Sequence, residues 1–225
     1  MKKIITLSTL LLTCAVSTFA EDKVKVTTAD RGDGKPGLGA DLWLNEKYPQ
    51  NHTGRTFSKT LMVRTNPKAN NPGILRFDLS LINTSKVSKC TLKIFFTGQN
   101  ENTIKVYALK DLEGSGELFN ERDVNWNTFA GLKKVDSDYT STHWDTTKII
   151  DLGTFKNPKN TNQWVTFSSE KLTQLVKSDS NHAIVIMLQG GTNSSSYATK
   201  EGDSEKAPQL IIQKKSITKS TIDSF

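Results

Sequence analysis

Cysteine is scarce in this sequence, whose 225 residues include only Cys14 and Cys90. Cys14 lies in an apolar stretch that follows two lysines and ends in small residues at Ala20, a pattern typical of a secretory signal peptide cleaved after Ala20. A lipoprotein acylated on Cys14 is the alternative, although Thr13 is larger than the residue usual before such a cysteine. Cleavage after Ala20 leaves Cys90 as the remaining cysteine, which excludes an internal disulfide.

Long apolar runs are also missing, because the apolar part of the leader is too short to cross a bilayer and no longer run follows it. We therefore expect no transmembrane helix and an extracytoplasmic protein, either secreted or periplasmic. We expect residues 1–20 to be the signal peptide, residues 21–213 one globular domain, and residues 214–225 a frayed tail with little to bury. About 200 residues suffice for one domain that buries most of its apolar surface.

Acidic residues are fewer than basic ones, with 23 Asp and Glu against 30 Lys and Arg, which gives a formal net charge of +7. Loss of the two leader lysines lowers this from +7 to +5 in the mature chain. A basic excess outside the cytoplasm favours a polyanionic partner, and there an acidic polysaccharide is more available than nucleic acid. We expect neither nucleic acid nor, after signal cleavage, a membrane as partner. Lysines that only maintain solubility are the alternative, and the oligomeric state is left open.

Strong catalytic motifs do not occur. The three histidines are far apart, and we find no zinc-protease motif, nucleophile elbow, phosphate loop or dinucleotide fingerprint. We therefore expect no enzymatic activity. A polysaccharide lyase is the alternative, because Tyr48, His52 and Arg55 would offer a base beside a charge-neutralising cation. A hydrolase would need two suitably spaced carboxylates. The candidates for those are Glu46, Asp78, Glu121 and Asp123.

A metal site has little support in the sequence. Residues 30–34 resemble a calcium loop, with Asp30 and Asp33 as candidate ligands, but they lack the ligand spacing of an EF-hand. An ordinary turn stabilised by aspartate is the simpler interpretation. We expect no cofactor, with Ca²⁺ at Asp30 and Asp33 as the alternative.

Short apolar or alternating runs, separated by Gly, Pro, Asn, Asp and Ser, dominate the rest of the chain and predict strands. The predicted strands cover residues 23–28, 59–65, 73–79, 89–97, 103–109, 149–152, 163–167, 182–189, 196–200 and 209–213. Apolar spacing predicts one short helix over 169–177. Residues 30–58 lack strand patterning, and so long a connection is usually functional or mobile. The pattern predicts an all-β fold, a jelly-roll β-sandwich with one short helix.

Three pairs of segments occur in a familiar order: GILRFDLS at 73–80 with 87–95, IKVYAL at 104–109 with NERDVNWN at 120–127, and YATKE at 197–201 with 207–212. Together they resemble the DNRLRE-type domains grouped as carbohydrate-binding module family 96. Two features depart from that family, since Phe119 or Asn120 stands where a Trp is common and the segment 45–57 is longer than expected. The resemblance implies a jelly-roll domain that binds polysaccharide without catalysis, alginate being the ligand associated with the family.

Basic and aromatic side chains would hold such a ligand. Lys and Arg can pair with sugar carboxylates, and aromatic rings can stack on pyranose faces. The candidates are Lys35, Lys47, Arg55, Lys59, Arg64 and Arg76, with Trp43 and Tyr48 as stacking residues. For Arg76, pairing with Asp78 on the same strand face is the favoured alternative. Trp126 and Trp164 are expected in the core. A structural or adhesive sandwich that binds a protein partner is a further alternative, and it predicts an exposed apolar patch.

Overall fold

The computed structural model describes residues 22–29, 39–51, 58–65, 70–111, 117–133 and 144–215. The expected signal peptide and most of the expected tail lie outside this part of the chain. The strands are β1 (Asp22–Thr27), β2 (Ala40–Trp43), β3 (Thr60–Val63), β4 (Gly73–Asp78), β5 (Val87–Phe96), β6 (Thr103–Leu109), β7 (Ile149–Lys156), β8 (Gln163–Phe167), β9 (Ala183–Gln189), β10 (Ser195–Ala198) and β11 (Gln209–Lys214). The helix is α1 (Glu170–Ser178), and the short 3₁₀ turns are η2 (Thr84–Lys86) and η3 (Ser204–Lys206).

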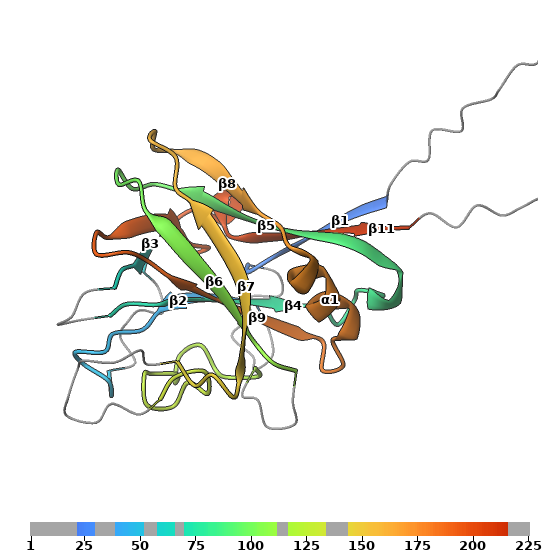
Figure 1. The fold of residues 1–225 in the computed structure, drawn as a ribbon, viewed down its shortest axis with the longest axis horizontal. Coiled ribbons are helices and arrows are strands. Elements are labelled where there is room, and N and C mark those ends of the chain that lie inside the picture. The colour runs from blue at the N-terminus through green and yellow to red at the C-terminus, as the bar shows by residue number, and fades with distance from the viewer. Residues whose placement is uncertain are drawn as a thin grey trace, which may run out of the picture.

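These strands form two antiparallel sheets that pack face to face as a β-sandwich (Figure 1). Sheet A has the order β1-β11-β5-β10-β3, with β8 on the other edge of β5. Sheet B has the order β2-β4-β9-β6-β7. The predicted all-β sandwich with one short helix is confirmed.

The pairing of strands is nested, as in a long hairpin wrapped around the core. β1 pairs with β11, β3 with β10, β4 with β9, β5 with β8, and β6 with β7. Successive pairs fall in sheets A, A, B, A and B. Such nesting is the pattern of a jelly roll, and it brings segments from opposite ends of the chain side by side.

The main core lies between the two sheets and is built from alternate residues of each strand. On β5, Cys90, Leu92, Ile94 and Phe96 are each at most 1% exposed, as their period of two predicts. Burial raises the pKa of the Cys90 thiol to about 12, so the group behaves as a small buried hydrophobe.

A second core covers the outer face of sheet B. The segment 117–133 packs Trp126 and Phe129 there against Ile74 of β4 and Met187 of β9. Because both faces of sheet B are covered, every residue of β4 is buried and β9 is apolar without alternation. β9 is the middle strand of sheet B, as its apolar run without alternation predicts, and the expected burial of Trp126, which is 2% exposed, is confirmed.

One strand was not predicted. The segment 30–58, expected to contain no strand, includes β2, whose four residues are all buried. A strand with both faces covered shows no alternation, so its short run cannot be recognised by period. The other strands lie within a few residues of the predicted ranges, with β7 extending to Lys156. No helix in the described ranges is long and apolar enough to cross a membrane.

Candidate functional site

An aromatic pair lies on the outer face of sheet A. The alternation of β5 turns Phe95 away from the core, and its direct cross-strand partner is Trp164 on β8. The two ring centroids are 5.3 Å apart and the rings meet at 82°, edge to face. This arrangement contributes about 0.5–1.5 kcal/mol beyond the area that the rings bury. Trp164 keeps part of its surface exposed, so its expected core position is wrong.

Two lysines flank this aromatic pair. The Lys93 Nζ lies 4.6 Å from the centroid of the Trp164 ring, and the Lys206 Nζ lies 5.1 Å from that of Phe95. Both distances are within the range of a cation–π interaction. Lys206 also forms an ion pair with Asp203 at 2.8 Å. We call these four residues, Lys93, Trp164, Phe95 and Lys206, the lysine–aromatic row.

Further lysines extend the positive charge along the same face. Lys23 on β1 is aligned with Gln213 on β11, which is aligned with Lys89 on β5. Directly paired residues point to the same side of a sheet, so Lys23 and Lys89 share the outer face with Lys93. Lys25 lies two residues along β1 from Lys23 and therefore shares that face. All but Lys93, which is partly exposed, are exposed. We call Lys23, Lys25, Lys89 and Lys93, together with Lys206, the basic face of sheet A.

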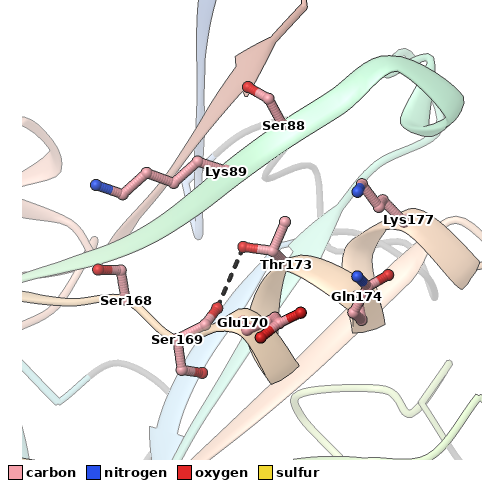
Figure 2. Close-up of a pocket in the computed structure, with 8 residues that line it drawn as sticks. All are labelled: Ser88, Lys89, Ser168, Ser169, Glu170, Thr173, Gln174 and Lys177. Atoms are coloured by element: carbon pink, nitrogen blue, oxygen red, sulfur yellow. Dashed lines mark hydrogen bonds between the residues drawn. The ribbon is translucent and has the colours of Figure 1, made fainter.

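A polar pocket of about 460 Å³ adjoins this face, between β5 and the start of α1 (Figure 2). Lys89 lines both the basic face and the pocket, and Lys177 stands at the far side. The Ser169 side chain caps α1 by accepting a hydrogen bond from the Leu172 amide at 3.1 Å. The remaining lining residues are Ser88, Ser168, Glu170, Thr173 and Gln174. The pocket thus continues the basic face with hydroxyl and amide groups that can hydrogen-bond to sugar hydroxyls.

The residues predicted to bind ligand are dispersed. Lys35 and Arg55 lie outside the described residues, as do Asp30, Asp33 and His52. Lys47 and Tyr48 are both exposed, and the Lys47 Nζ lies 5.4 Å from the Tyr48 ring centroid.

Lys59 is exposed beside β3, while the Arg64 Nε donates to Asn71 Oδ1 at 2.6 Å. Trp43 is only 8% exposed, because it lies in β2 and packs in the main core. That burial does not fit the loop position expected of a stacking residue.

The four carboxylates named for hydrolysis serve mainly as hydrogen-bond acceptors. Buried Glu46 accepts from the Asn70 amide at 3.1 Å, and buried Asp78 accepts from the Ser80 amide at 2.9 Å. Asp123 is exposed. Glu121 belongs to a different arrangement, a buried network of charged groups.

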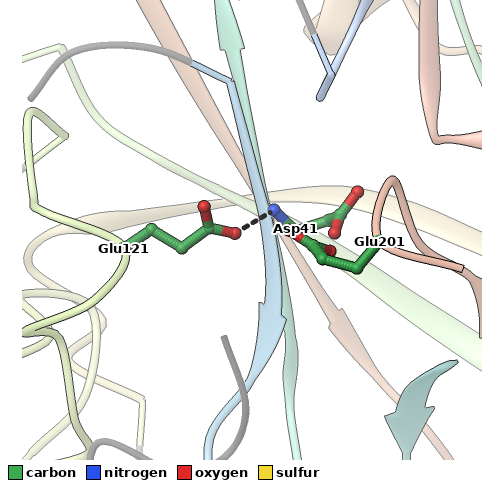
Figure 3. Close-up of side chains that lie close together, drawn as sticks. All are labelled: Asp41, Glu121 and Glu201. Atoms are coloured by element: carbon green, nitrogen blue, oxygen red, sulfur yellow. Dashed lines mark hydrogen bonds between the residues drawn. The ribbon is translucent and has the colours of Figure 1, made fainter. Parts of the chain in front are cut away.

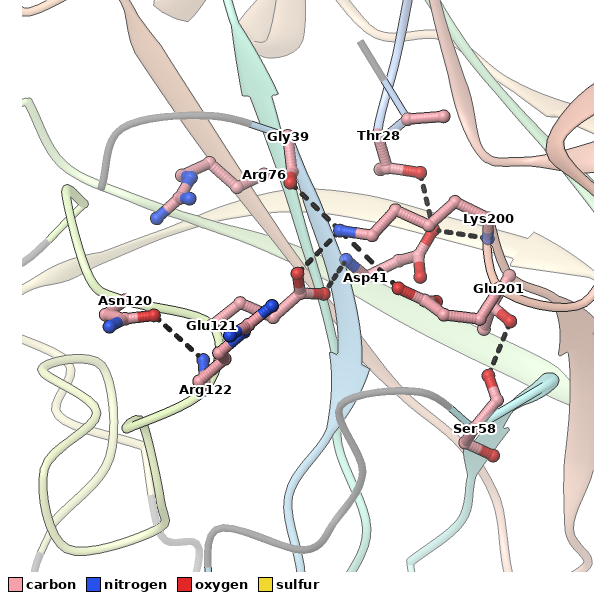
Figure 4. A network of polar contacts seen from close by, with 12 residues as sticks. Thr28, Gly39, Asp41, Ser58, Arg76, Asn120, Glu121, Arg122, Lys200 and Glu201 are labelled. Carbon is pink, nitrogen blue, oxygen red and sulfur yellow. Dashed lines mark hydrogen bonds and ion pairs between the residues drawn. The ribbon is translucent and has the colours of Figure 1, made fainter. Parts of the chain in front are cut away.

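This network joins residues from all three of the motif pairs. Arg76 belongs to the first, Glu121 to the second, and Lys200 and Glu201 to the third, and β2 adds Asp41 (Figure 4). We call these five residues the buried charge network. Lys200 is its centre, because its Nζ lies 2.6 Å from Glu121 Oε2 and 3.8 Å from Glu201 Oε1. The same Nζ donates to the Gly39 carbonyl at 3.0 Å.

Asp41 is fully buried and tied to three segments. Its Oδ2 accepts from the Thr28 hydroxyl at 2.5 Å and from the Lys200 amide at 3.0 Å, while its own amide donates to Glu121 at 3.0 Å. Gly39 allows the start of β2 to lie close to Thr28, since a Cβ at position 39 would be 2.3 Å from the Thr28 carbonyl oxygen. Burial, and then the charge of Glu201, raise the pKa of Asp41 well above its usual value.

Arg76 is 1% exposed and lies against the segment that covers sheet B. It donates to the Phe119 carbonyl, and its guanidinium lies 4.5 Å from the Phe119 ring centroid. Burial lowers its pKa to about 10, and the charges of Glu121 and, less strongly, Asp78 oppose that change. The burial of Arg76 does not fit a ligand-binding role. Its favourable charge interaction is larger with Glu121 than with Asp78, the partner that the sequence favoured.

No protein-family model and no curated protein sequence matches this chain. The resemblance to carbohydrate-binding module family 96 therefore stays a prediction. Of the lysine–aromatic row, the alternation of β5 in the sequence predicts Lys93 on the face opposite the core, which the structure confirms. Trp164 and Lys206 required the register of β8 and the position of η3.

Proposed function

We propose that this protein is a noncatalytic carbohydrate-binding protein that recognises an acidic extracellular polysaccharide, such as alginate, on the basic face of sheet A. The observation that carries the proposal is the lysine–aromatic row. Trp164 offers a partly exposed ring, and each ring of the aromatic pair has a lysine Nζ near it, 4.6 Å from the Trp164 centroid and 5.1 Å from the Phe95 centroid.

The chemistry of the row matches two features of a uronic acid chain. The C–H groups of a pyranose pack against an aromatic face, while its carboxylate attracts an ammonium group. Neighbouring strands are about 4.8 Å apart, so the outer face from β1 to β8 extends about 14 Å across the strands. A linear polymer can contact several of the lysines at once across that distance, and the sum of weak contacts then supplies affinity.

Affinity gel electrophoresis and calorimetry with alginate, a second acidic polysaccharide and a neutral glucan test this proposal. Lys93→Ala is the informative variant, and Lys105→Ala is the matched control because Lys105 is an exposed lysine on β6 of sheet B. We expect retardation by the acidic polymers, weaker retardation of Lys93→Ala, and an unchanged Lys105→Ala protein. Migration of the wild-type protein at its free rate in every gel would reject the proposal.

The same incubations separate binding from catalysis. A lyase would release unsaturated sugar products that absorb ultraviolet light, and a hydrolase would release reducing ends. We expect neither product from alginate at high protein concentration. Steady release of either one would replace the proposed binding function with an enzymatic one.

A further inference from the structure

One side of the buried charge network has carboxylate oxygens without donors. Asp41 is 0% exposed, and among the residues that the structure describes its Oδ1 has no hydrogen-bond partner. Glu201 Oε2 is also buried and has no hydrogen-bond partner among the described residues. The two carboxyl groups lie side by side (Figure 3). Buried acceptors without a donor are costly, so this pair calls for a positive species beside it.

The charge of Lys200 lowers the pKa of both carboxyl groups, but its ammonium group gives neither of these two oxygens a hydrogen bond. Its short contacts are with Glu121 Oε2 and the Gly39 carbonyl, and it approaches Glu201 through Oε1, the oxygen opposite the unpartnered Oε2. Arg76 donates to the Phe119 carbonyl. Among the five residues of the buried charge network, three carboxylates stand against these two cations, and Figure 4 shows Arg122 as a further cation of the same polar network.

The positions of the oxygens fit a metal ion. Asp41, Glu121 and Glu201 each offer one carboxylate oxygen, and these atoms all lie within 4.8 Å of one another. Oxygens that share a calcium ion at about 2.3–2.6 Å are separated by at most about twice that distance. A donor set of carboxylates, without histidine or cysteine, suits a hard cation and not zinc.

We propose that Asp41, Glu201 and Glu121 form a binding site for a divalent cation, with Ca²⁺ as the ion that fits best. The ion would bind at Asp41 Oδ1 and Glu201 Oε2, the two buried oxygens that have no donor among the described residues. It would link β2, the turn after β10 and the segment that covers sheet B. Gly202 allows this turn to pack closely against Lys59, since a Cβ there would lie 2.5 Å from the Lys59 carbonyl oxygen.

A proton shared between Asp41 and Glu201 is the competing occupant, because one carboxyl group would then donate to the other. Burial raises the pKa of both groups, which favours either a proton or a metal ion over two bare carboxylates. The two occupants differ in their response to Ca²⁺ and to a chelator, and that difference is the basis of the test.

The experiment uses the mature protein at neutral pH without polysaccharide, so its result does not depend on the proposed function. After treatment with EDTA and its removal, Ca²⁺ is titrated by calorimetry and by thermal unfolding. We expect one ion per chain and, at about a hundred times Kd, a rise in Tm of about 5 °C or more. Absence of both effects up to about 10 mM Ca²⁺, above the Kd of about 10⁻⁴–10⁻³ M of extracellular calcium modules, would overturn the site.

Variants locate the ion. Asp41→Asn and Glu201→Gln keep the shape of the side chains and remove ligand charge, so each should weaken Ca²⁺ binding at least tenfold. Glu101→Gln changes an exposed glutamate outside the network and should bind Ca²⁺ as the wild type does. Circular dichroism checks that each variant is folded. If Asp41→Asn does not fold, the wild-type titration with Ca²⁺ decides whether the site exists. Equal Ca²⁺ binding by wild type and Glu201→Gln would contradict the assignment.

Discussion

Phe95 and Trp164 are direct cross-strand partners whose rings meet edge to face, 5.3 Å apart, on the outer surface of sheet A. The pair holds the partly exposed indole in one orientation, and the flanking Lys93 and Lys206 lie near its two rings. A partly exposed ring beside ammonium groups is suited to a ligand with both C–H faces and carboxylates. The first predictions concern this pair.

Replacement of Trp164 should separate ring stacking from folding. We expect Trp164→Ala to weaken alginate binding at least tenfold, and Trp164→Phe to have an intermediate affinity because a smaller ring remains. The edge-to-face contact is worth about 0.5–1.5 kcal/mol, so Trp164→Ala should still be folded, with a similarly small loss of stability. Calorimetry with alginate and urea denaturation measure the two effects. Undiminished binding by Trp164→Ala would place the ligand elsewhere on the protein.

Binding should weaken as salt concentration rises. The lysines of the basic face are mostly exposed, and salt screens interactions between exposed charges over about 8–10 Å at physiological ionic strength. The affinity for alginate is expected to fall several-fold between low and physiological salt. Lys93→Ala, with one charge fewer, should respond less steeply, and a titration at several salt concentrations compares the two slopes. Affinity independent of salt would argue against carboxylate recognition by lysine.

Loss of Lys200 should destabilise the fold strongly. The side chains of Lys200 and Glu121 are only 13% and 16% exposed, and removal of Lys200 takes away the ammonium group that lies 2.6 Å from the Glu121 carboxylate. Breaking a buried ion pair by removing one partner costs about 3–5 kcal/mol, which is the loss expected for Lys200→Met. Lys105→Met, an exposed lysine on β6, is the control and should change stability by less than about 0.5 kcal/mol. Urea denaturation reports both values, and equal losses would contradict a role for the network.

Asp179 should make the protein less stable as pH rises. Burial, and then the charge of Asp111, raise its pKa from 3.8 to about 6, while the amides of Ala183 and His182 oppose this only in part. Because the folded pKa exceeds the unfolded one, the favourable contribution is complete below pH 3.8 and is lost as pH rises to about 6. Above that pH the ionised carboxylate of Asp179 destabilises the folded state.

Asp179→Asn is therefore expected to be more stable than wild type at pH 7, by about 1 kcal/mol after allowance for solvent screening. The advantage should shrink toward zero at pH 4, where the wild-type carboxyl is largely protonated in the fold. Urea denaturation at the two pH values tests this. An advantage of the same size at both would point to a cause other than titration of Asp179.

The thiol of Cys90 should not react in the native protein. Its side chain is 0% exposed, and its pKa of about 12 keeps it protonated at neutral pH. Labelling of Cys90 by iodoacetamide is expected to be very slow in buffer and complete in urea. Rapid labelling in buffer would show that β5 opens readily.

Sequence patterns found most strands, including β4 and β9, which are buried on both faces, and missed β2, which is both short and fully buried. The alternation of β5 and β8 was sufficient to predict their ranges. β2 carries four buried residues, including Asp41, and has no period to recognise because its outer face is also covered. The same covering of sheet B explains why Arg76, predicted on an outward face, is buried in the structure.

The candidate sites depend on contacts that local pattern cannot show. Asp41 and Glu121 are 80 positions apart, and Asp41 and Lys200 are 159 apart, yet direct hydrogen bonds join them. The family resemblance rests on segments that contain Arg76, Glu121 and Glu201, but it could not show that these three side chains lie close together. Trp164 was expected in the core because tryptophan is usually buried, and only its register with Phe95 places it on the outer face.

The sequence by itself determined the β class, the period of most strands and the surplus of lysine, because these follow from local spacing and composition. Export of the chain is predicted from the sequence alone. Tertiary structure decided which lysines share a face, which tryptophan is exposed and which carboxylates meet Lys200. The physical reason is the nested pairing of the jelly roll, which brings together residues that are far apart in the chain and covers one sheet on both sides.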